Sequence, residues 1–251
     1  MVKVHHLNCG RMHAPPYPPA ICHCLLLEDE AGLALVDTGL GLLDVRHPLE
    51  RIGQPLLDLV GFQFHEDDTA IRQIESRGLS PARVRHVILT HADNDHVGGL
   101  ADFPAARVHI SAEELASVRD GHSRYLPQPF AHGPQWEPVP PCDLKWFGLP
   151  ARPVPLGLSA EVLLIPLFGH THGHCGVAIR QPRGWLLHAG DAYYLRVETV
   201  RDDDPVSQLA TLRADDNAQR LDSLAQLRRL LRDHADEIEI FGYHDPHELP
   251  R

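Results

Sequence analysis

The feature that most constrains this chain is an apolar run, 84–89, followed at once by the segment His91-Ala-Asp93-Asn-Asp95-His96. The run VRHVIL is almost continuously apolar, which is typical of a strand buried on both faces of a sheet. Four of the six residues in the segment after it can bind a metal ion through an imidazole or a carboxylate. Because loops at strand ends carry functional groups, we predict a metal site at the end of this strand.

The rest of the chain alternates between strand-like and helix-like patterns. Short apolar runs bounded by Gly, Pro and Asp predict strands, and apolar stripes at helical spacing predict helices. Both halves of the chain pair strands with helices, so we expect two sheets packed between helices. The predicted strands cover 2–7, 21–27, 33–36, 84–89, 107–110, 161–165, 175–179, 185–189 and 238–241.

Three helices have recognisable signals. Ser and Thr are common residues at the first position of a helix, and a Glu three residues later can complete a capping box. The signals are a cap at Asp68-Thr69, the capping box Ser111-Ala-Glu-Glu114, and the stripe Leu221, Leu224, Leu227 and Leu231 on a helix over 216–233.

Residues 120–159 have a different character. They hold nine of the chain's 22 prolines, interleaved with aromatic residues such as Tyr125, Trp136 and Trp146. A loop of this length is usually a functional lid or a linker, and its aromatic content argues against a flexible linker. We therefore expect residues 1–251 to form a single domain in which 120–159 is a flap facing the substrate. A packed surface cover is the alternative.

The charge balance excludes some classes of partner. Acidic residues outnumber basic ones by 34 to 23, and no run of Lys or Arg could follow a phosphate backbone. We find neither a signal-peptide pattern nor the ~18 to 20 apolar residues of a membrane span. We expect a cytoplasmic protein that binds a small-molecule substrate, with no nucleic acid and no membrane as partner. A homodimer stays open.

The five cysteines are an odd number without framework spacing, which indicates reduced thiols. Cys22-His-Cys24 could be a pair of zinc ligands, but it lies inside an apolar run that predicts a buried strand. We therefore interpret both cysteines as core residues.

Three more segments place potential ligands just after predicted strands. His170 lies in Phe168-Gly-His-Thr-His-Gly-His174, Asp191 ends His188-Ala-Gly-Asp191, and His244 follows Phe241-Gly-Tyr. Imidazole and carboxylate ligands suit zinc, iron or manganese. Two metal ions ~3.5 to 4 Å apart need about this many ligands and a bridging carboxylate. The residues are therefore sufficient for a dinuclear site.

Taken together, these motifs resemble the metallo-β-lactamase superfamily, in the branch of the N-acyl-homoserine lactonases and glyoxalase II. His91-Ala-Asp-Asn-Asp-His96 is an HxDxDH variant of the family's HxHxDH motif. Asp37-Thr-Gly39, His170-Thr-His-Gly-His174, Gly190-Asp191 and His244 follow in the family's order, so the resemblance covers roughly residues 2–245. It implies an α/β fold of four layers, an αβ/βα sandwich of two mixed β-sheets flanked by helices.

The resemblance also implies two divalent metal ions, zinc as the first expectation and iron or manganese as alternatives. Asp191 would bridge the two ions. Asp37 and His174 would support the ligands from behind, whereas His172 and His188 would be neighbours of the site. The other implied ligands are His91, Asp93 and His170 for the first ion, and Asp95, His96 and His244 for the second.

The departure from the family's pattern is Asp93, which stands where the common motif has its second histidine. Either its carboxylate coordinates the first ion and makes that site more anionic, or it does not reach and the site binds metal weakly. We favour coordination. Flavodiiron proteins of the same superfamily carry a carboxylate at this position and hold iron, which keeps iron and manganese open.

The implied activity is metal-dependent hydrolysis of a carboxylic ester or lactone of a small molecule. A hydroxide that bridges the two ions would be the nucleophile, and Asp95 or Asp191 would transfer the proton. Tyr194 is placed like a phenol used by the lactonases and could donate to the oxyanion, although packing under the flap is an equal alternative. The alternative functions are a glyoxalase II-type thioester hydrolase and an iron-dependent oxygenase or redox protein of the same fold.

Overall fold

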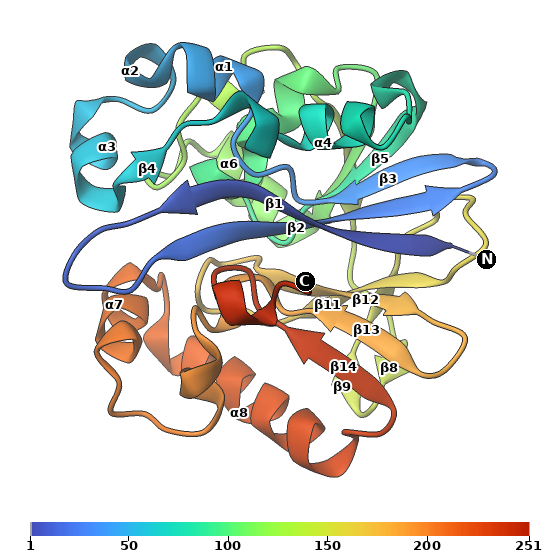
Figure 1. Ribbon diagram of the computed structural model, residues 1–251. Coiled ribbons are helices and arrows are strands. Elements are labelled where there is room, and N and C mark those ends of the chain that lie inside the picture. Colours follow the sequence, from blue (N-terminus) through green and yellow to red (C-terminus); the bar gives the residue numbers. More distant parts are fainter. Residues whose placement is uncertain (1, 251) are drawn as a thin grey trace.

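The structure, a computed structural model that describes residues 2–250, has two β-sheets packed face to face with helices on both outer faces (Figure 1). The predicted four-layer αβ/βα sandwich is confirmed, and both sheets are mixed. The first half of the chain builds one sheet with its helices, and the second half builds the other.

The first sheet has seven strands in the order β4-β1-β2-β3-β5-β6-β7. Neighbours from β3 to β7 run parallel, and the pairs on the β1 side are antiparallel. The strands are β1 (Lys3–Met12), β2 (Ala20–Asp29), β3 (Gly32–Val36), β4 (Phe62–Gln63), β5 (Val84–Ile88), β6 (Arg107–Ser111) and β7 (Gln135–Val139).

The second sheet has five strands in the order β10-β11-β12-β13-β14, and its last pair is parallel. A separate two-stranded hairpin precedes it in the chain. The strands are β10 (Arg152–Pro153), β11 (Val162–Pro166), β12 (Cys175–Arg180), β13 (Trp185–His188) and β14 (Ile238–Phe241), with the hairpin β8 (Lys145–Trp146) and β9 (Leu149–Pro150).

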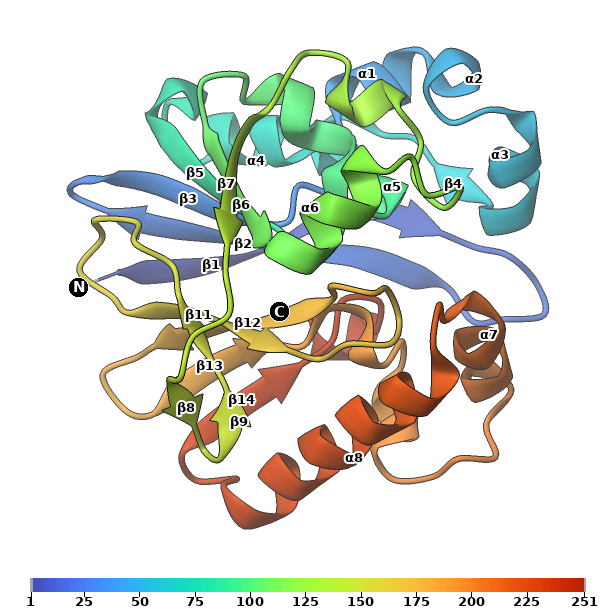
Figure 2. The same cartoon turned by 180° about the vertical axis from the view of Figure 1, so that it is seen from behind.

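Within residues 2–250, helices α1 to α6 lie on the side of the first sheet and α7 and α8 on the side of the second, an arrangement that can be followed in the reverse view (Figure 2). The helices are α1 (Leu42–Arg46), α2 (Pro48–Arg51), α3 (Gln54–Val60), α4 (Ala70–Ser76), α5 (Asn94–Val97) and α6 (Ala112–Arg119) on the first side, and α7 (Pro205–Arg213) and α8 (Asn217–Asp233) on the second.

Alternate residues of the central strands face different layers, which explains their continuous apolar character. In β2, Leu25 and Leu27 belong to the core between the two sheets, whereas Leu26 belongs to the core beneath α4 and α6. In β11, Leu164 faces the first sheet and Leu163 packs with α8. A strand with helices on one side and a second sheet on the other has no polar face.

All nine predicted strands are present, with ends that shift by a few residues. Strands 62–63, 135–139, 145–146, 149–150 and 152–153 were not predicted, because these short or proline-containing segments lack a clear alternation. Helix α8 is capped by Asp216, but Leu221, which was predicted to belong to the apolar stripe, is 45% exposed. Leu230 takes its place among the buried leucines.

The segment 120–159 divides into parts with different surroundings. Residues 122–124 and Leu126 line a pocket, whereas β7 pairs with β6 and places Trp136 against the core of the first half. The β8–β9 hairpin buries Trp146 in the core between the second sheet and α8. The part of the predicted flap that can contact a substrate is therefore its first few residues.

Two further expectations concern the whole chain. All five cysteines have free thiols, and Cys22 and Cys24 are fully buried, which agrees with the interpretation as core residues. Among residues 2–250, no helix has both the length and the apolar composition that crossing a bilayer requires.

Candidate metal centre

The loops that carry the predicted ligands all follow strands and meet at one edge of the two sheets. His91 and Asp93 follow β5, and Asp95 and His96 lie in the short helix α5 that comes next. The remaining loops follow β11, β13 and β14 in the second sheet. They carry His170, Asp191 and His244. The candidate metal centre is therefore built from both halves of the chain.

The first group of potential ligands comprises His91, His170 and Asp191, each offering one atom within 4.8 Å of the others. The Nε2 atom of His170 lies 3.4 Å from Asp191 Oδ2, and that of His91 lies 3.9 Å from the same oxygen. Asp93 Oδ2 lies 3.4 Å from His170 Nε2 and 3.5 Å from His91 Nε2. All four side chains are nearly or completely buried.

The second group comprises Asp95, His96 and His244. Asp95 Oδ2 lies 3.8 Å from His96 Nε2 and 3.7 Å from His244 Nε2. Tyr243 stacks on the His96 ring with 3.8 Å between the ring centroids, and its hydroxyl donates to the backbone oxygen of Asp95 at 2.6 Å. The stacking ring and this hydrogen bond hold two members of the group in place.

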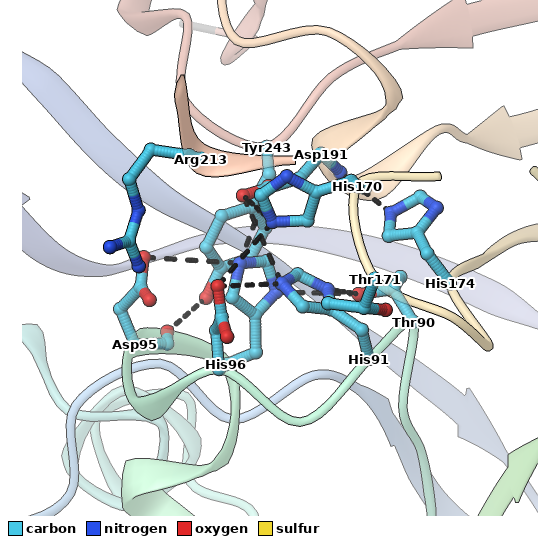
Figure 3. Close-up of polar contacts among 12 residues, drawn as sticks. Thr90, His91, Asp95, His96, His170, Thr171, His174, Asp191, Arg213 and Tyr243 are labelled. Atoms are coloured by element: carbon cyan, nitrogen blue, oxygen red, sulfur yellow. Dashed lines mark hydrogen bonds and ion pairs between the residues drawn. The ribbon is translucent and has the colours of Figure 1, made fainter. Parts of the chain in front are cut away.

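Asp191 lies between the two groups, and the close-up shows His170 of the first group and His96 of the second directed toward it (Figure 3). Its Oδ1 is 3.3 Å from His96 Nε2, and its Oδ2 is 3.2 Å from His244 Nε2. Gly190 allows the backbone to place Asp191 between the groups. Its φ of +56° is left-handed, and a Cβ added at this residue would lie 2.5 Å from His174 Nε2. The Gly-Asp motif thus places one carboxylate within reach of both groups.

Hydrogen bonds from behind orient the imidazoles so that their Nε2 atoms face the centre. His96 Nδ1 donates to Asp37 Oδ2 at 2.9 Å, and His244 Nδ1 donates to the backbone oxygen of Ile21 at 2.9 Å. Asp37 itself has a φ of +54°, an uncommon conformation for a non-glycine residue. His174 Nε2 accepts the backbone N–H of Asp191 at 2.9 Å. Asp37 and His174 thus lie behind the ligands, as expected.

The remaining motif histidines lie apart from the two groups. His188 Nε2 donates to the backbone oxygen of His23 at 2.6 Å, and His172 is exposed. Neither belongs to the first or the second group of potential ligands.

The residues fit a pair of metal ions. His91 Nε2, His96 Nε2 and Asp191 Oδ1 are buried and lack a hydrogen-bonding partner, an arrangement that is costly unless something else satisfies them. Ligand atoms bound to one tetrahedral zinc ion at about 2.0 to 2.1 Å lie about 3.4 Å from one another. The distances of 3.2 to 3.9 Å between donor atoms in both groups match this spacing.

Arg124 is a neighbour of the first group that the sequence did not indicate. Its Nε and Nη2 atoms donate to the two oxygens of Asp93 at 2.5 and 2.6 Å. The same Nη2 lies 2.8 Å from His170 Nε2, and Nη1 donates to Asp215 at 3.2 Å. Although burial opposes ionisation, the guanidinium holds the pKa of Asp93 well below its usual range. The carboxylate that replaces the common histidine is therefore paired with a buried cation.

Glu114 is the second residue whose role was missed. The structure confirms that Ser111 Oγ accepts the backbone N–H of Glu114 at 3.1 Å, but the carboxylate does not complete the predicted capping box. It accepts instead from the backbone of Ala92 at 2.9 Å and from Thr171 Oγ1 at 2.7 Å. Glu114 thus ties the loop after β5 to the loop after β11, and burial raises its pKa.

A pocket of about 690 Å³ opens above the two groups, with Asp95, Asp191 and His244 at its base. Most of its other lining is apolar and comes from both halves of the chain. The apolar side chains include Met12, Leu56, Leu59, Val60, Phe62, Leu195, Val206, Leu209 and Leu212.

Tyr194 also lines this pocket and is 9% exposed. Its ring meets His170 of the first group and His244 of the second edge to face, at centroid distances of 5.7 and 5.2 Å. Burial, with a contribution from the Asp191 carboxylate, raises the pKa of its phenol well above the usual value. The group is therefore a protonated hydrogen-bond donor at neutral pH. Tyr17 lines the pocket as well, whereas Tyr125 donates to Glu114 at 2.8 Å.

Comparison with known families agrees with this geometry. The family model described as the metallo-beta-lactamase superfamily matches residues 17–238. The chain is 38% identical to a probable metallo-hydrolase of Mycobacterium tuberculosis, over 98% of this chain and 81% of the relative. It is 25% identical to the N-acyl homoserine lactonase AttM of Azorhizobium caulinodans, over 76% of this chain and 72% of that protein.

A similar fold is found in a solved N-acyl homoserine lactone hydrolase, whose structure contains the product N-hexanoyl-L-homoserine at the catalytic metal centre. The TM-score is 0.75 at 22% sequence identity, with 98% of this chain and 94% of that chain covered. From the family match and the ordered motifs, the chain belongs to the metallo-beta-lactamase superfamily.

Proposed function

We propose that this protein is a dinuclear metal-dependent hydrolase of small carboxylic esters or lactones. One observation carries the proposal. Potential ligand atoms lie in two groups around Asp191 beside a largely apolar pocket, and three of them, His91 Nε2, His96 Nε2 and Asp191 Oδ1, are buried without a hydrogen-bonding partner. The first ion would be held by His91, Asp93, His170 and Asp191, and the second by Asp95, His96, His244 and Asp191. Zinc suits this ligand set, with iron and manganese as alternatives.

When bound, two divalent ions polarise a scissile carbonyl and lower the pKa of a water molecule toward neutrality. The chain's own residues supply the rest of the chemistry. Asp191 and Asp95 face the pocket and can hold a proton during the transfer to the leaving group. The apolar lining excludes water from the reacting groups and strengthens these charge interactions.

The shape and lining of the pocket support an ester or lactone with an apolar acyl group. Its lining combines leucine, valine and phenylalanine side chains with the polar groups of Asp95, Asp191 and His244. This combination suits a molecule with one polar reacting end and one apolar end. The similarity to an N-acyl homoserine lactonase is consistent with such a substrate.

Tyr194 is our candidate for a donor to the developing oxyanion. Its phenol lines the pocket, stays protonated at neutral pH, and lies between one histidine of each group. A preorganised neutral donor at this place stabilises negative charge that appears only in the transition state.

The test is hydrolysis of N-acyl homoserine lactones and of simple aryl esters by the purified protein, with metal content measured in parallel. We expect at least two metal ions per chain, and we expect activity that disappears on chelation and returns when metal is added. Full activity in a metal-free preparation would contradict the proposal. Oxygen uptake in proportion to turnover of a thiol or persulfide would favour the oxygenase alternative instead.

A further inference from the structure

A third cluster of potential metal ligands lies outside the two groups at the centre. His122, His172 and Asp215 each offer one ligand atom, and these atoms lie within 4.8 Å of one another. The three residues come from separate parts of the chain. His122 follows α6, His172 is in the loop after β11, and Asp215 precedes α8.

Backbone hydrogen bonds hold these three segments in place without any ligand. The N–H of Asp215 donates to the backbone oxygen of His170 at 3.1 Å, which fixes it beside the loop that carries His172. The N–H of His122 donates to the backbone oxygen of Ser117 at the end of α6, at 3.1 Å. The His122 and His172 rings lie edge to face, with centroids 5.7 Å apart. The cluster is thus arranged before any ion binds.

The carboxylate of Asp215 supplies an independent indication of a ligand. Its side chain is only 10% exposed, and its Oδ1 accepts from Arg124 Nη1 at 3.2 Å. Its Oδ2 is buried and has no hydrogen-bonding partner. A buried carboxylate oxygen without a partner costs free energy that a bound cation would recover.

We propose that His122, His172 and Asp215 form a third metal site, beside the pocket, that binds a divalent ion such as Zn²⁺. Two imidazoles and one carboxylate are a ligand set that zinc accepts while keeping a position open for a further ligand. His122 and Asp215 line the same pocket as the catalytic groups. An ion there therefore presents a positive charge with a free coordination position to a molecule that enters the pocket, which favours substrates with an anionic or carbonyl group at that end.

The experiment is a titration of the metal-free full-length protein with Zn²⁺ alone. Binding is measured by calorimetry and by competition with a chromophoric chelator. We expect three equivalents for the wild type and two for His172→Ala, with the two remaining affinities unchanged. His65→Ala is the matched control, because His65 is an exposed histidine that belongs to none of the ligand clusters, and it should retain three equivalents.

His122→Ala provides a second, independent variant, and it should weaken the third equivalent by at least about tenfold, as loss of a ligand or its support does. Circular dichroism and the two retained equivalents would show that both variants are folded. Equal stoichiometry and affinity in the wild type and both variants would overturn the third site. The two proposals can fail separately. If both variants lose the third equivalent but the wild type hydrolyses none of the esters, the third site is supported and only the proposed function is rejected.

Discussion

The two ligand groups of the candidate metal centre, called here its first and second halves, differ in their surroundings, although both are built from histidines and aspartates. In the first half, the Asp93 carboxylate is held by the guanidinium of Arg124, which also lies 2.8 Å from the Nε2 atom of His170. In the second half, Asp95, His96 and His244 form no hydrogen bond or ion pair with an Arg or Lys side chain among residues 2–250. The substitution of a carboxylate for the common histidine is thus accompanied by an internal cation.

This difference has a direct consequence for metal binding. The lone pair on His170 Nε2 cannot accept a hydrogen bond from Arg124 and bind a metal ion at the same time. The first half must therefore move Arg124 Nη2 away before an ion can bind, whereas the second half needs no such change. We expect the two halves to bind metal with unequal affinity, the second more tightly.

The largest effect is expected for Asp191→Ala, because its carboxylate lies within 4 Å of histidines of both groups. We expect loss of both metal ions and a fall in kcat/KM on the order of 10³, as removal of several kcal/mol of metal-assisted stabilisation implies. Metal analysis and ester kinetics on the purified variant test this. Asp143→Ala is the control, because Asp143 is exposed and lies outside every ligand cluster. Retention of both ions of the centre in Asp191→Ala would exclude a bridging role.

The two halves can be separated by replacing one histidine from each. Titration of the metal-free protein should give two unequal binding phases for the metal centre. His244→Ala should remove the tighter phase and His91→Ala the weaker one, because each takes a ligand from one half only. Equal phases in the wild type, or loss of the tighter phase in His91→Ala, would reverse the assignment.

A substitution of Arg124 removes the cation that is paired with Asp93. Arg124→Gln should strengthen binding in the first half by about tenfold, because the competing guanidinium is gone and Asp93 keeps its charge. It should also destabilise the metal-free protein by about 3 to 5 kcal/mol, because Asp93 and Arg124 are both largely buried. Metal titration and thermal unfolding measure both effects, and added metal should restore the lost stability.

Arg183→Gln is the control for this variant, because Arg183 is exposed and far along the chain in a turn before β13. Weaker metal binding by Arg124→Gln would mean that the guanidinium positions Asp93 as a ligand instead of competing with the ion.

The smallest effect is expected for Tyr194→Phe. This variant tests whether the Tyr194 phenol, which lies between the two halves, donates a hydrogen bond to the oxyanion. Loss of a single neutral hydrogen bond should lower kcat by about tenfold and leave the metal content unchanged. KM should change little if the phenol acts mainly in the transition state. A variant with wild-type kcat would assign Tyr194 to packing against His170 and His244, whose rings it meets.

Much of the architecture could be predicted from the chain because the strands repeat a clear pattern. β2, β3 and β11 are buried on both faces, and such strands are continuous apolar runs that are recognisable in isolation. β5 is buried at Val87 and Ile88 but leaves Arg85 exposed, so the expectation of a strand buried on both faces holds only for its second half. β7 and the β8–β9 hairpin were missed because their prolines and short length remove that pattern. Leu221 was placed in the buried stripe because spacing alone does not define which edge of a helix reaches solvent.

The ordered motifs of candidate ligands can be recognised in the chain alone, because each candidate ligand follows a strand whose end is set by local pattern. The surroundings of these residues depend on how the two sheets pack. Arg124 and Asp215 lie 31 and 122 residues from Asp93 in the chain, yet both belong to its environment, because the two sheets bring their loops to one edge. Glu114 likewise has a local cap signal but bonds to Ala92 and Thr171. Hydrogen bonds between distant loops depend on packing, and spacing along the chain does not encode them.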